Sequence, residues 1–400
     1  MDYDFIIVGA GPVGSNLSKS LAEEGWSVCV FEQKEEAGEG VICSGIVGQD
    51  AYEKFKLPVK AIIREISSLK LFSPSLVELE YLREKPFAYI VDRKKFDKEL
   101  VGEAAREGVD ISLDSRVFEI NREKNRASIK YHKNGKEFSK SARCIIIASG
   151  TNFSLHGKMG LSVPGGILWG NRVEVKGGEE KGSVEVYILN EPDLSSFGWV
   201  IPMNGHTRIG SLSSKSSQES LKDLIYKSNG RFDVNLEKLE KAPIACGNTE
   251  KITDERVLAV GEAAGQVKTT TGGGIYYGLI GASIAFEVLS SAAKINDFSA
   301  GMLKKYEDIW VDRMGEEIRN GIMVRKVASK LTPKIVDNVF NFFKKNPSAK
   351  EELEEKFRFD YHRDIIKSGI GFFLKKVPNN FSGKSLPGSG FNSIAEYFSG

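Results

Sequence analysis

The chain has 400 residues, 41% of them hydrophobic and 28% charged, with a formal net charge of +2. This composition predicts a globular protein that buries a large core in two or three structural units, and the near-neutral charge excludes a general affinity for nucleic acid. The first strand begins at once, without room for a signal peptide, and we expect no apolar run that spans a bilayer. A cytoplasmic protein is therefore expected.

The first predicted strand and the turn after it form a dinucleotide-binding pattern. Phe5 to Val8 is a short apolar run typical of a buried parallel strand, and apolar residues recur at helical spacing after the turn. Between them, Gly9 permits the turn, Gly11 lets the backbone approach a pyrophosphate, and Gly14 lets the helix pack on the strand. A second apolar strand ends at Glu32, where a carboxylate can accept hydrogen bonds from ribose hydroxyls.

The next segments continue an α/β pattern. A helix is predicted over residues 92–108, and two or three strands between residues 109 and 138, with Asn134-Gly135 as a strong hairpin turn signal. The apolar run at residues 144–150 ends in small residues. It is typical of a strand that returns to a parallel sheet beside a bound ligand.

The middle of the chain predicts a separate sheet, because between residues 163 and 244 the apolar period shortens toward two. A helix near residues 220–228 closes this block. A strand that ends in an acid and small residues then recurs at 256–265, and Gly272 to Gly274 open an apolar helix. We therefore expect a discontinuous cofactor domain at 1–72, 88–160 and 250–298, an antiparallel-sheet substrate domain at 73–87 and 161–249, and a C-terminal helical region at 299–400.

Metal chemistry is not indicated by the sequence. The four cysteines, which are scattered without metal-ligand spacing, are Cys29, Cys43, Cys144 and Cys246. The four histidines form no clustered pair, so neither a zinc site nor a histidine-based triad is expected.

Four signatures in one order resemble the FAD-dependent geranylgeranyl reductase family, and within it the archaeal digeranylgeranylglycerophospholipid reductases. They are Gly9 to Gly14 with Glu32, Asp92-Arg93 followed by Phe96-Asp97, Phe197 to Pro202, and Gly261 to Gly265. The resemblance spans roughly the first three quarters of the chain. It implies the p-hydroxybenzoate hydroxylase type of fold, with a Rossmann-like FAD domain, an antiparallel substrate sheet and C-terminal helices.

The resemblance also implies a set of FAD contacts. They are Gly9, Gly11, Gly14 and Ser15 at the phosphates, Glu32 and Gln33 at the adenosine ribose, Val117 at the adenine, Cys43, Ser44 and Ile46 along the ring or ribityl chain, Arg93 at the phosphate or ribityl side, and Gly261, Glu262, Gly273, Gly274 and Ile275 at the other end. Glu262 stands where family members often have aspartate. For Arg93, a surface salt bridge with Asp97 is the alternative interpretation.

Two features favour a reductase within this fold: the loop around Cys43, and the glycine turn from Thr271 to Gly278, which resembles the turn that these reductases place beneath the pyrimidine end of the flavin. The loop around Cys43 resembles the cysteine loop that these reductases place against the flavin, and an inert buried thiol is the alternative interpretation of Cys43. The block at Phe197, Trp199, Ile201 and Pro202 partly matches the family's Pro-x-x-Tyr-x-Trp-x-Phe-Pro wall of the lipid cavity, and Tyr276 is expected beside it. Core packing is the alternative role for Trp199. The proton donor is left open between Cys43, Tyr276 and Tyr277.

The expected reaction is the saturation of isolated double bonds in geranylgeranyl chains of prenyl lipids, with Cys43 and Trp199 as the catalytic residues. The electron donor is NAD(P)H or a ferredoxin-like carrier. A flavin monooxygenase or halogenase is the alternative, because residues 197–202 approach a Trp-x-Trp-x-Ile-Pro block whose first tryptophan is absent here. A prenyl-lipid carrier that retains FAD structurally is the non-enzymatic alternative.

The last hundred residues show helical patterns at 340–343 and 365–374, with Lys344-Lys345 and Lys375-Lys376 beside aromatic residues. Packing helices with solvated lysines are the simpler interpretation. The alternative is peripheral membrane contact, in which Phe342 and Phe343 insert while the lysines attract anionic headgroups.

Overall fold

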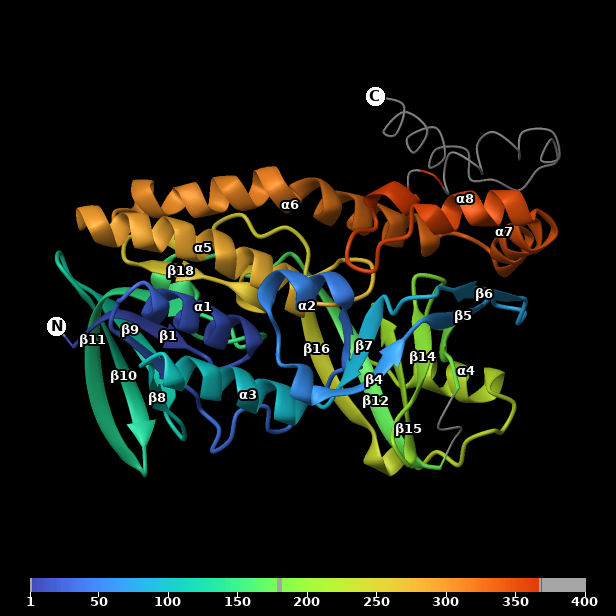
Figure 1. Cartoon of the computed structure of the whole chain (residues 1–400), viewed down its shortest axis with the longest axis horizontal. Helices are drawn as coiled ribbons and strands as arrows, with labels where there is room; N and C mark the ends of the chain where they lie inside the picture. Colours follow the sequence, from blue (N-terminus) through green and yellow to red (C-terminus); the bar gives the residue numbers. More distant parts are fainter. Residues whose placement is uncertain (1, 178–181, 367, 369–400) are drawn as a thin grey trace.

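A computed structural model describes residues 2–177, 182–366 and 368, and its described strands form three sheets (Figure 1). The cofactor sheet occupies the left of the view and the substrate sheet the right. Helices α5 (Ile275–Ile295) and α6 (Ala300–Ala328) run across the top toward α7 (Pro333–Lys345) and α8 (Pro347–Glu355). The α/β fold with a second sheet and C-terminal helices is as predicted.

The cofactor sheet has eight strands, and its central strand is the predicted first strand. The strands are β1 (Tyr3–Val8), β2 (Val28–Phe31), β8 (Asp110–Ser112), β9 (Arg116–Arg122), β10 (Ala127–Lys133), β11 (Lys136–Ile147), β17 (Thr253–Asp254) and β18 (Val257–Ala259). β1 pairs in parallel with both β2 and β11, and Phe5, Ile6 and Ile7 are fully buried. A strand covered on both faces needs such a continuous apolar run.

One long strand replaces two predicted segments. The hairpin turn at Asn134-Gly135 is confirmed, with positive φ at both residues between β10 and β11. β11 does not stop after the hairpin, however. It continues to Ile147 and pairs in parallel with β1 and β18, so that its second half is the predicted strand that returns to the parallel sheet.

The helices of the cofactor domain pack on one another as well as on the sheet. α1 (Pro12–Glu23) contacts both α3 (Arg93–Arg106) and α5, and α6 packs on α5. α3 begins at Asp92, whose side chain accepts a hydrogen bond of 3.0 Å from the backbone N–H of Lys95. Contrary to the sequence expectation, α5 is long and apolar enough to cross a membrane, but 67% of its most apolar window is buried, as in a core helix.

The substrate sheet has seven strands in the order β16-β12-β15-β14-β13-β5-β6. They are β5 (Ser68–Phe72), β6 (Glu78–Leu82), β12 (Gly166–Lys176), β13 (Val184–Ile188), β14 (Phe197–Pro202), β15 (His206–Ser213) and β16 (Glu240–Cys246). The helix α4 (Glu219–Lys227) packs on β14 and β15. The predicted boundary at residue 72 is wrong, because β5 pairs with β13 and therefore belongs to this sheet.

A small third sheet joins the two domains. It consists of β3 (Ile46–Gly48), β4 (Ile62–Ile66) and β7 (Ala88–Val91), and α2 (Gln49–Phe55) follows β3 directly. Four short 3-10 helices complete the described elements: η1 (Val59–Ala61), η2 (Gly157–Met159), η3 (Leu236–Lys238) and η4 (Gly261–Ala264).

The C-terminal helices lie against the substrate sheet. Asp337 of α7 accepts hydrogen bonds from the hydroxyls of Ser73 and Ser75, which fixes α7 at the turn between β5 and β6. Phe343 is 6% exposed, so the prediction that it inserts into a membrane is wrong. Most of the helix predicted at 365–374, and the pair Lys375-Lys376, lie outside the described residues.

Candidate functional site

A single cavity of about 870 Å³ extends from the glycine turn after β1 to the C-terminal part of α6. Both main sheets, the loop around Cys43, η4 and the start of α5 contribute to its wall. Nearly all the predicted cofactor residues line it. They are Gly9, Gly11, Gly14, Glu32, Gln33, Cys43, Ser44, Ile46, Arg93, Val117, Gly261, Glu262, Gly273, Gly274 and Ile275.

The glycine turn forms a cradle for an anion. Gly9 has a φ of +113°, and a Cβ there would overlap the carbonyl of Ala148, whereas Gly11 has open space around its Cα. Pro12 at the first helical position has no N–H, and the N–H groups of Val13 and Gly14 have no acceptor among the described residues. Free N–H groups at a positive helix end are what a pyrophosphate requires.

Glu32 links the turn to the end of β2. Its carboxylate accepts hydrogen bonds from the backbone N–H groups of Ala10, at 2.9 Å, and of Lys34, at 3.1 Å. Each carboxylate oxygen has further acceptor capacity, which suits a ribose hydroxyl in the adjoining cavity. Ser15, which was predicted at the phosphates, does not line the cavity: it is 1% exposed, and its hydroxyl donates to the carbonyl of Ala10.

The other end of the cradle is formed by η4 and the turn before α5. Glu262 accepts a hydrogen bond of 2.9 Å from the backbone N–H of Ala245, so it connects the cofactor domain to β16. Burial raises the pKa of Glu262 to about 7, although the Ala245 hydrogen bond and the Arg93 charge lower it. Gly274 caps α5 without a side-chain hydrogen bond, which leaves donors for a flavin carbonyl. The residues at both ends therefore fit FAD.

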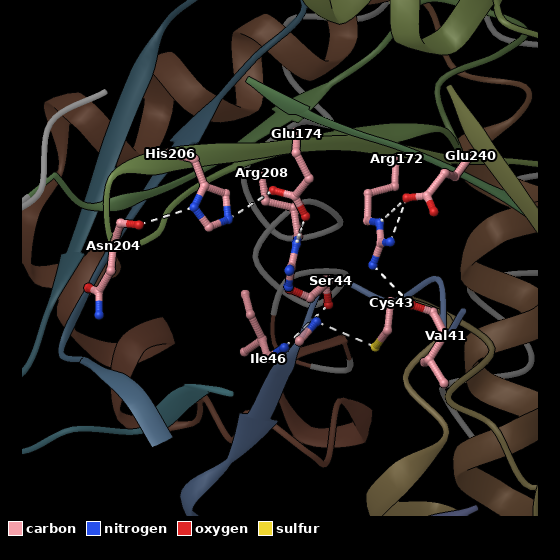
Figure 2. A network of polar contacts seen from close by, with 11 residues as sticks. Val41, Cys43, Ser44, Ile46, Arg172, Glu174, Asn204, His206, Arg208 and Glu240 are labelled. Atoms are coloured by element: carbon pink, nitrogen blue, oxygen red, sulfur yellow. Dashed lines mark hydrogen bonds and ion pairs between the residues drawn. The ribbon is translucent and has the colours of Figure 1, made fainter. Parts of the chain in front are cut away.

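Two arginines of the substrate sheet hold the loop around Cys43, as Figure 2 shows. Arg172 donates to the carbonyl of Val41 at 3.0 Å, and Arg208 donates to the carbonyl of Ser44 at 2.9 Å. The backbone N–H of Gly45 donates to the Cys43 sulfur at 3.4 Å. The loop thus has contacts from the opposite domain, which fix the position of the thiol in the cavity.

The Cys43 thiol lies in a positive environment. Burial by itself raises its pKa, but the Arg93 guanidinium, the Gly45 N–H and Arg208 outweigh that effect and hold the pKa below its ordinary value. In contrast, burial raises the pKa of Cys29 and of Cys246, to about 12 and about 11. Cys43 is therefore unlike the thiols that pack in strands.

Arg93 lies where a cofactor contact remains open to it, and it forms the ion pair that the sequence offered as the alternative. Its side chain lines the cavity, and it also pairs with Asp97 through two hydrogen bonds of 3.2 and 3.1 Å. The pair is buried rather than on the surface, with side-chain exposures of 13% and 2%.

The aromatic wall is only partly as predicted. Phe197 and Trp199 line the cavity, with ring centroids 5.9 Å apart, and the indole N–H of Trp199 has no partner among the described residues. Ile201 is fully buried in a neighbouring core cluster, and Pro202 is also buried outside the cavity. Their predicted substrate contact is therefore wrong, because β14 leaves the cavity before it ends.

The two predicted tyrosines separate. Tyr276 lines the cavity, and its hydroxyl lies 3.3 Å from that of Tyr361. Tyr277 is 2% exposed and does not line the cavity, which removes it as a proton donor. Burial raises the pKa of the Tyr276 hydroxyl above its ordinary value, so Tyr276 keeps its proton.

Sequence reasoning missed the polar groups that the C-terminal segment adds. Lys268 donates to Asp360 at 2.8 Å, and the two side chains are 6% and 2% exposed. His362 lies beside them: its Nε2 is 3.1 Å from the carbonyl of Phe359 and its Nδ1 is 2.6 Å from the Thr270 hydroxyl. Because the carbonyl only accepts, Nε2 carries the proton and Nδ1 accepts from Thr270. Of these residues, only Lys268 lies near a predicted motif, since it precedes Gly272 by four positions.

The comparisons with known proteins agree with this geometry. Residues 2–308 match the family described as FAD binding domain. The chain is 30% identical to the digeranylgeranylglycerophospholipid reductase of Methanocaldococcus jannaschii over 352 residues, covering 84% of this chain and 89% of the relative. It is 29% identical to digeranylgeranylglycerophospholipid reductase 1 of Methanococcoides burtonii over 399 residues, covering 95% and 98%.

Solved structures share the fold. A geranylgeranyl bacteriochlorophyll reductase-like protein of Thermoplasma acidophilum superposes with a TM-score of 0.81 at 20% identity, over 99% of both chains. A flavin-dependent brominase superposes with a TM-score of 0.70 at 16% identity, also over 99% of both chains. Among the described residues, no group of three or more His, Cys, Asp or Glu side chains is arranged to hold a metal ion.

Proposed function

The chain belongs to the geranylgeranyl reductase family of FAD-dependent oxidoreductases, and we propose that it saturates isolated carbon–carbon double bonds in the geranylgeranyl chains of prenyl lipids. The names of the relatives support geranylgeranyl glycerophospholipids as the substrate class.

The observation that supports this proposal most strongly is the continuity of the cavity. Beyond the cofactor cradle it runs over the faces of β5, β13 and β14, and alternate residues of each strand point into it. Those apolar residues are Leu69, Leu71, Val184, Val186, Ile188, Phe197 and Trp199. A wall of this kind suits a long hydrocarbon chain and excludes water from it.

Positioning of the alkene is the main task of the protein in this reaction. Bound FAD, once reduced, supplies the electron pair that saturation requires. An isolated alkene has no carbonyl group that could be polarised, so the rate depends on how closely the wall holds the reacting carbons in place. Phe197 and Trp199 provide flat aromatic area for this purpose.

Saturation also requires a proton at the second carbon. Cys43 and Tyr276 are the two proposed donors that line the cavity. Cys43 gives up its proton more readily, because Arg93 and Arg208 stabilise the thiolate. We therefore favour the Cys43 sulfur as the atom that holds the transferred proton.

The decisive experiment is anaerobic mass spectrometry of geranylgeranyl glycerophospholipid incubated with dithionite-reduced holoenzyme. We expect mass gains of whole hydrogen pairs and reoxidation of the flavin. The absence of any mass gain would reject the reductase function.

The likeness to a brominase keeps oxygen-dependent chemistry as a second candidate function. In that case product forms only with oxygen, and for a halogenase only when halide is also present, whereas the reductase works without either.

The electron donor is proposed as NAD(P)H or a ferredoxin-like carrier. Measuring the anaerobic reduction of the flavin by each of them distinguishes the two.

Peripheral membrane contact is also proposed, now on Lys344 and Lys345 alone, which are exposed at the end of α7. Binding to anionic liposomes should weaken with salt and with charge reversal at both lysines. If the protein is active on dispersed lipid but does not bind liposomes at low salt, the proposal of membrane contact is wrong.

A further inference from the structure

The basic residues that line the cavity differ in how they are neutralised. They are Arg93, Arg116, Arg172, Lys268 and Arg325, besides His362. Arg93, Arg172 and Lys268 each form an ion pair with a carboxylate. Arg116 is exposed to solvent. Arg325 is half-buried. No carboxylate oxygen among the described residues lies within 4.0 Å of its guanidinium nitrogens, the distance that defines an ion pair.

Among the described residues, the hydrogen-bond partners of Arg325 are neutral. In the last turn of α6, its Nη1 donates to the carbonyl of Thr270 at 3.3 Å and its Nη2 donates to the Ser195 hydroxyl at 3.2 Å. Charge-assisted hydrogen bonds of a guanidinium are typically shorter, about 2.7–2.9 Å. Burial lowers the pKa of Arg325, although Cys246 and Asp193 oppose it. A half-buried cation with two long, neutral contacts retains donors for an anion.

Two serine hydroxyls accompany this guanidinium in the cavity wall. Ser196 is fully buried, and its hydroxyl has no hydrogen-bond partner among the described residues. Ser195 accepts from Arg325 through its oxygen, so its O–H can still donate. Asp193 fixes the loop, because its carboxylate accepts from the Ser195 N–H at 2.8 Å and its carbonyl accepts from the Ser196 N–H at 3.0 Å.

We propose that Arg325, Ser195 and Ser196 form an anion subsite that binds the phosphate of the prenyl-lipid substrate. The guanidinium fork and two hydroxyl donors match phosphate oxygens, whereas a hydrocarbon chain would leave all of them unpaired. The serine loop runs directly into β14, so the subsite adjoins the wall formed by Phe197 and Trp199. This inference rests on the proposed function, and it makes Arg325 the residue that selects phosphorylated lipids.

The test compares two lipids in the reduced holoenzyme under anaerobic conditions: digeranylgeranylglyceryl phosphate and digeranylgeranylglycerol, which lacks the phosphate. Arg325→Gln should raise the KM for the phosphorylated lipid about tenfold to a hundredfold, the range expected for lost charge-assisted hydrogen bonds. The KM for the phosphate-free lipid should change less than about twofold. Arg325→Lys should restore part of the affinity, because it returns the charge without the fork.

Matched variants exclude a general effect on folding. Ser196→Ala should weaken binding of the phosphorylated lipid and leave the melting temperature unchanged, since it removes a hydroxyl that no described group pairs with. Ser290→Ala removes another buried hydroxyl that has no partner in the described part of the chain, lies away from the cavity, and should change neither. Arg319→Gln, an exposed arginine on the same helix, should behave like the unmodified protein.

Inorganic phosphate distinguishes the sources of the anion. If inorganic phosphate competes with the phosphorylated lipid in the unmodified protein but not in Arg325→Gln, the subsite also binds the free ion. If it does not compete, the subsite binds phosphate only as part of the lipid. Equal KM changes for both lipids, or loss of FAD from Arg325→Gln, would overturn the proposal. If neither lipid is reduced, the proposed function fails, and equilibrium binding of the two lipids, followed by protein fluorescence, decides the subsite by the same criteria.

Discussion

Trp199 of β14 lies directly over Gly210 of the adjacent strand β15, and the indole occupies the space that a side chain at Gly210 would need. A Cβ at Gly210 would overlap two carbons of the indole ring and the carbonyl of Asn171. The absence of a side chain on one strand thus sets the position of the aromatic wall on the next.

Gly210→Ala should therefore displace Trp199 and reduce turnover of prenyl lipid, because small displacements of the reacting carbons have large effects on rate. Trp199→Ala should have the same direction of effect. FAD content, measured by absorbance, should hardly change in either variant. Gly102→Ala on α3 is the control, since a Cβ there meets no other atom within 4 Å and the residue lies outside the cavity. Full activity of Gly210→Ala would mean that Trp199 is a packing residue.

Cys43 should be the cysteine that iodoacetamide labels fastest in the apoprotein near neutral pH. Its pKa is lowered beside Arg93, whereas burial raises the pKa of Cys29, Cys144 and Cys246. Peptide mass spectrometry would measure the order, and Arg93→Gln should slow the labelling of Cys43. Cys43→Ser should keep FAD but lower turnover or change the number of double bonds reduced. Unchanged activity and products would assign Cys43 to packing.

Glu262 should make the stability of the apoprotein fall as pH rises. Its pKa is raised from 4.5 to about 7 in the folded state, so between these values the folded state binds more protons than the unfolded state. The stability that this group contributes is complete below pH 4.5 and is lost as pH rises through about 7. Glu262→Gln keeps an acceptor for the Ala245 N–H without the ionisation. The melting temperature of Glu262→Gln, relative to that of the unmodified protein, should rise from pH 5 to pH 8. If the two melting temperatures change in parallel with pH, the burial argument is contradicted.

The ion pair between Lys268 and Asp360 should be sensitive to the loss of one partner. Lys268→Met leaves a buried carboxylate alone, which costs about 3–5 kcal/mol of unfolding free energy. Adding Asp360→Asn should recover much of that loss, because no buried charge then remains. Urea unfolding would measure both. Lys222→Met, which breaks an exposed pair with Glu219, should cost less than about 1 kcal/mol. Additive effects at Lys268 and Asp360 would show that the pair is not coupled.

Glu32→Ala should lower the affinity for FAD about tenfold to a hundredfold, as expected for the loss of roughly 1.5–3 kcal/mol of charge-assisted hydrogen bonding. The variant also removes the acceptor for the Ala10 N–H, so the glycine turn loses a support. FAD titration of the apoprotein would measure the change. Glu35→Ala, an exposed neighbour outside the cavity, is the control and should bind FAD normally. Equal affinity of both variants would remove Glu32 from the cofactor site.

The sequence by itself determined the parts of this protein that depend on local spacing. The strand, turn and helix from Phe5 to Gly14 were predictable because burial on both faces, a tight turn and close packing each demand particular residue types at adjacent positions. The hairpin at Asn134-Gly135 follows from the same local logic, since both residues must adopt positive φ.

Only the tertiary structure decided which distant segments meet. β5 joins the substrate sheet through β13, although the local pattern placed it in the cofactor domain. Arg325 meets Ser195 across 130 positions of the chain, and Lys268 meets Asp360 across 92. Strand pairing and long-range ion pairs depend on the path of the whole chain. The spacing of a side chain from its sequence neighbours does not predict that path. The cavity wall and its polar groups are therefore properties of the folded molecule.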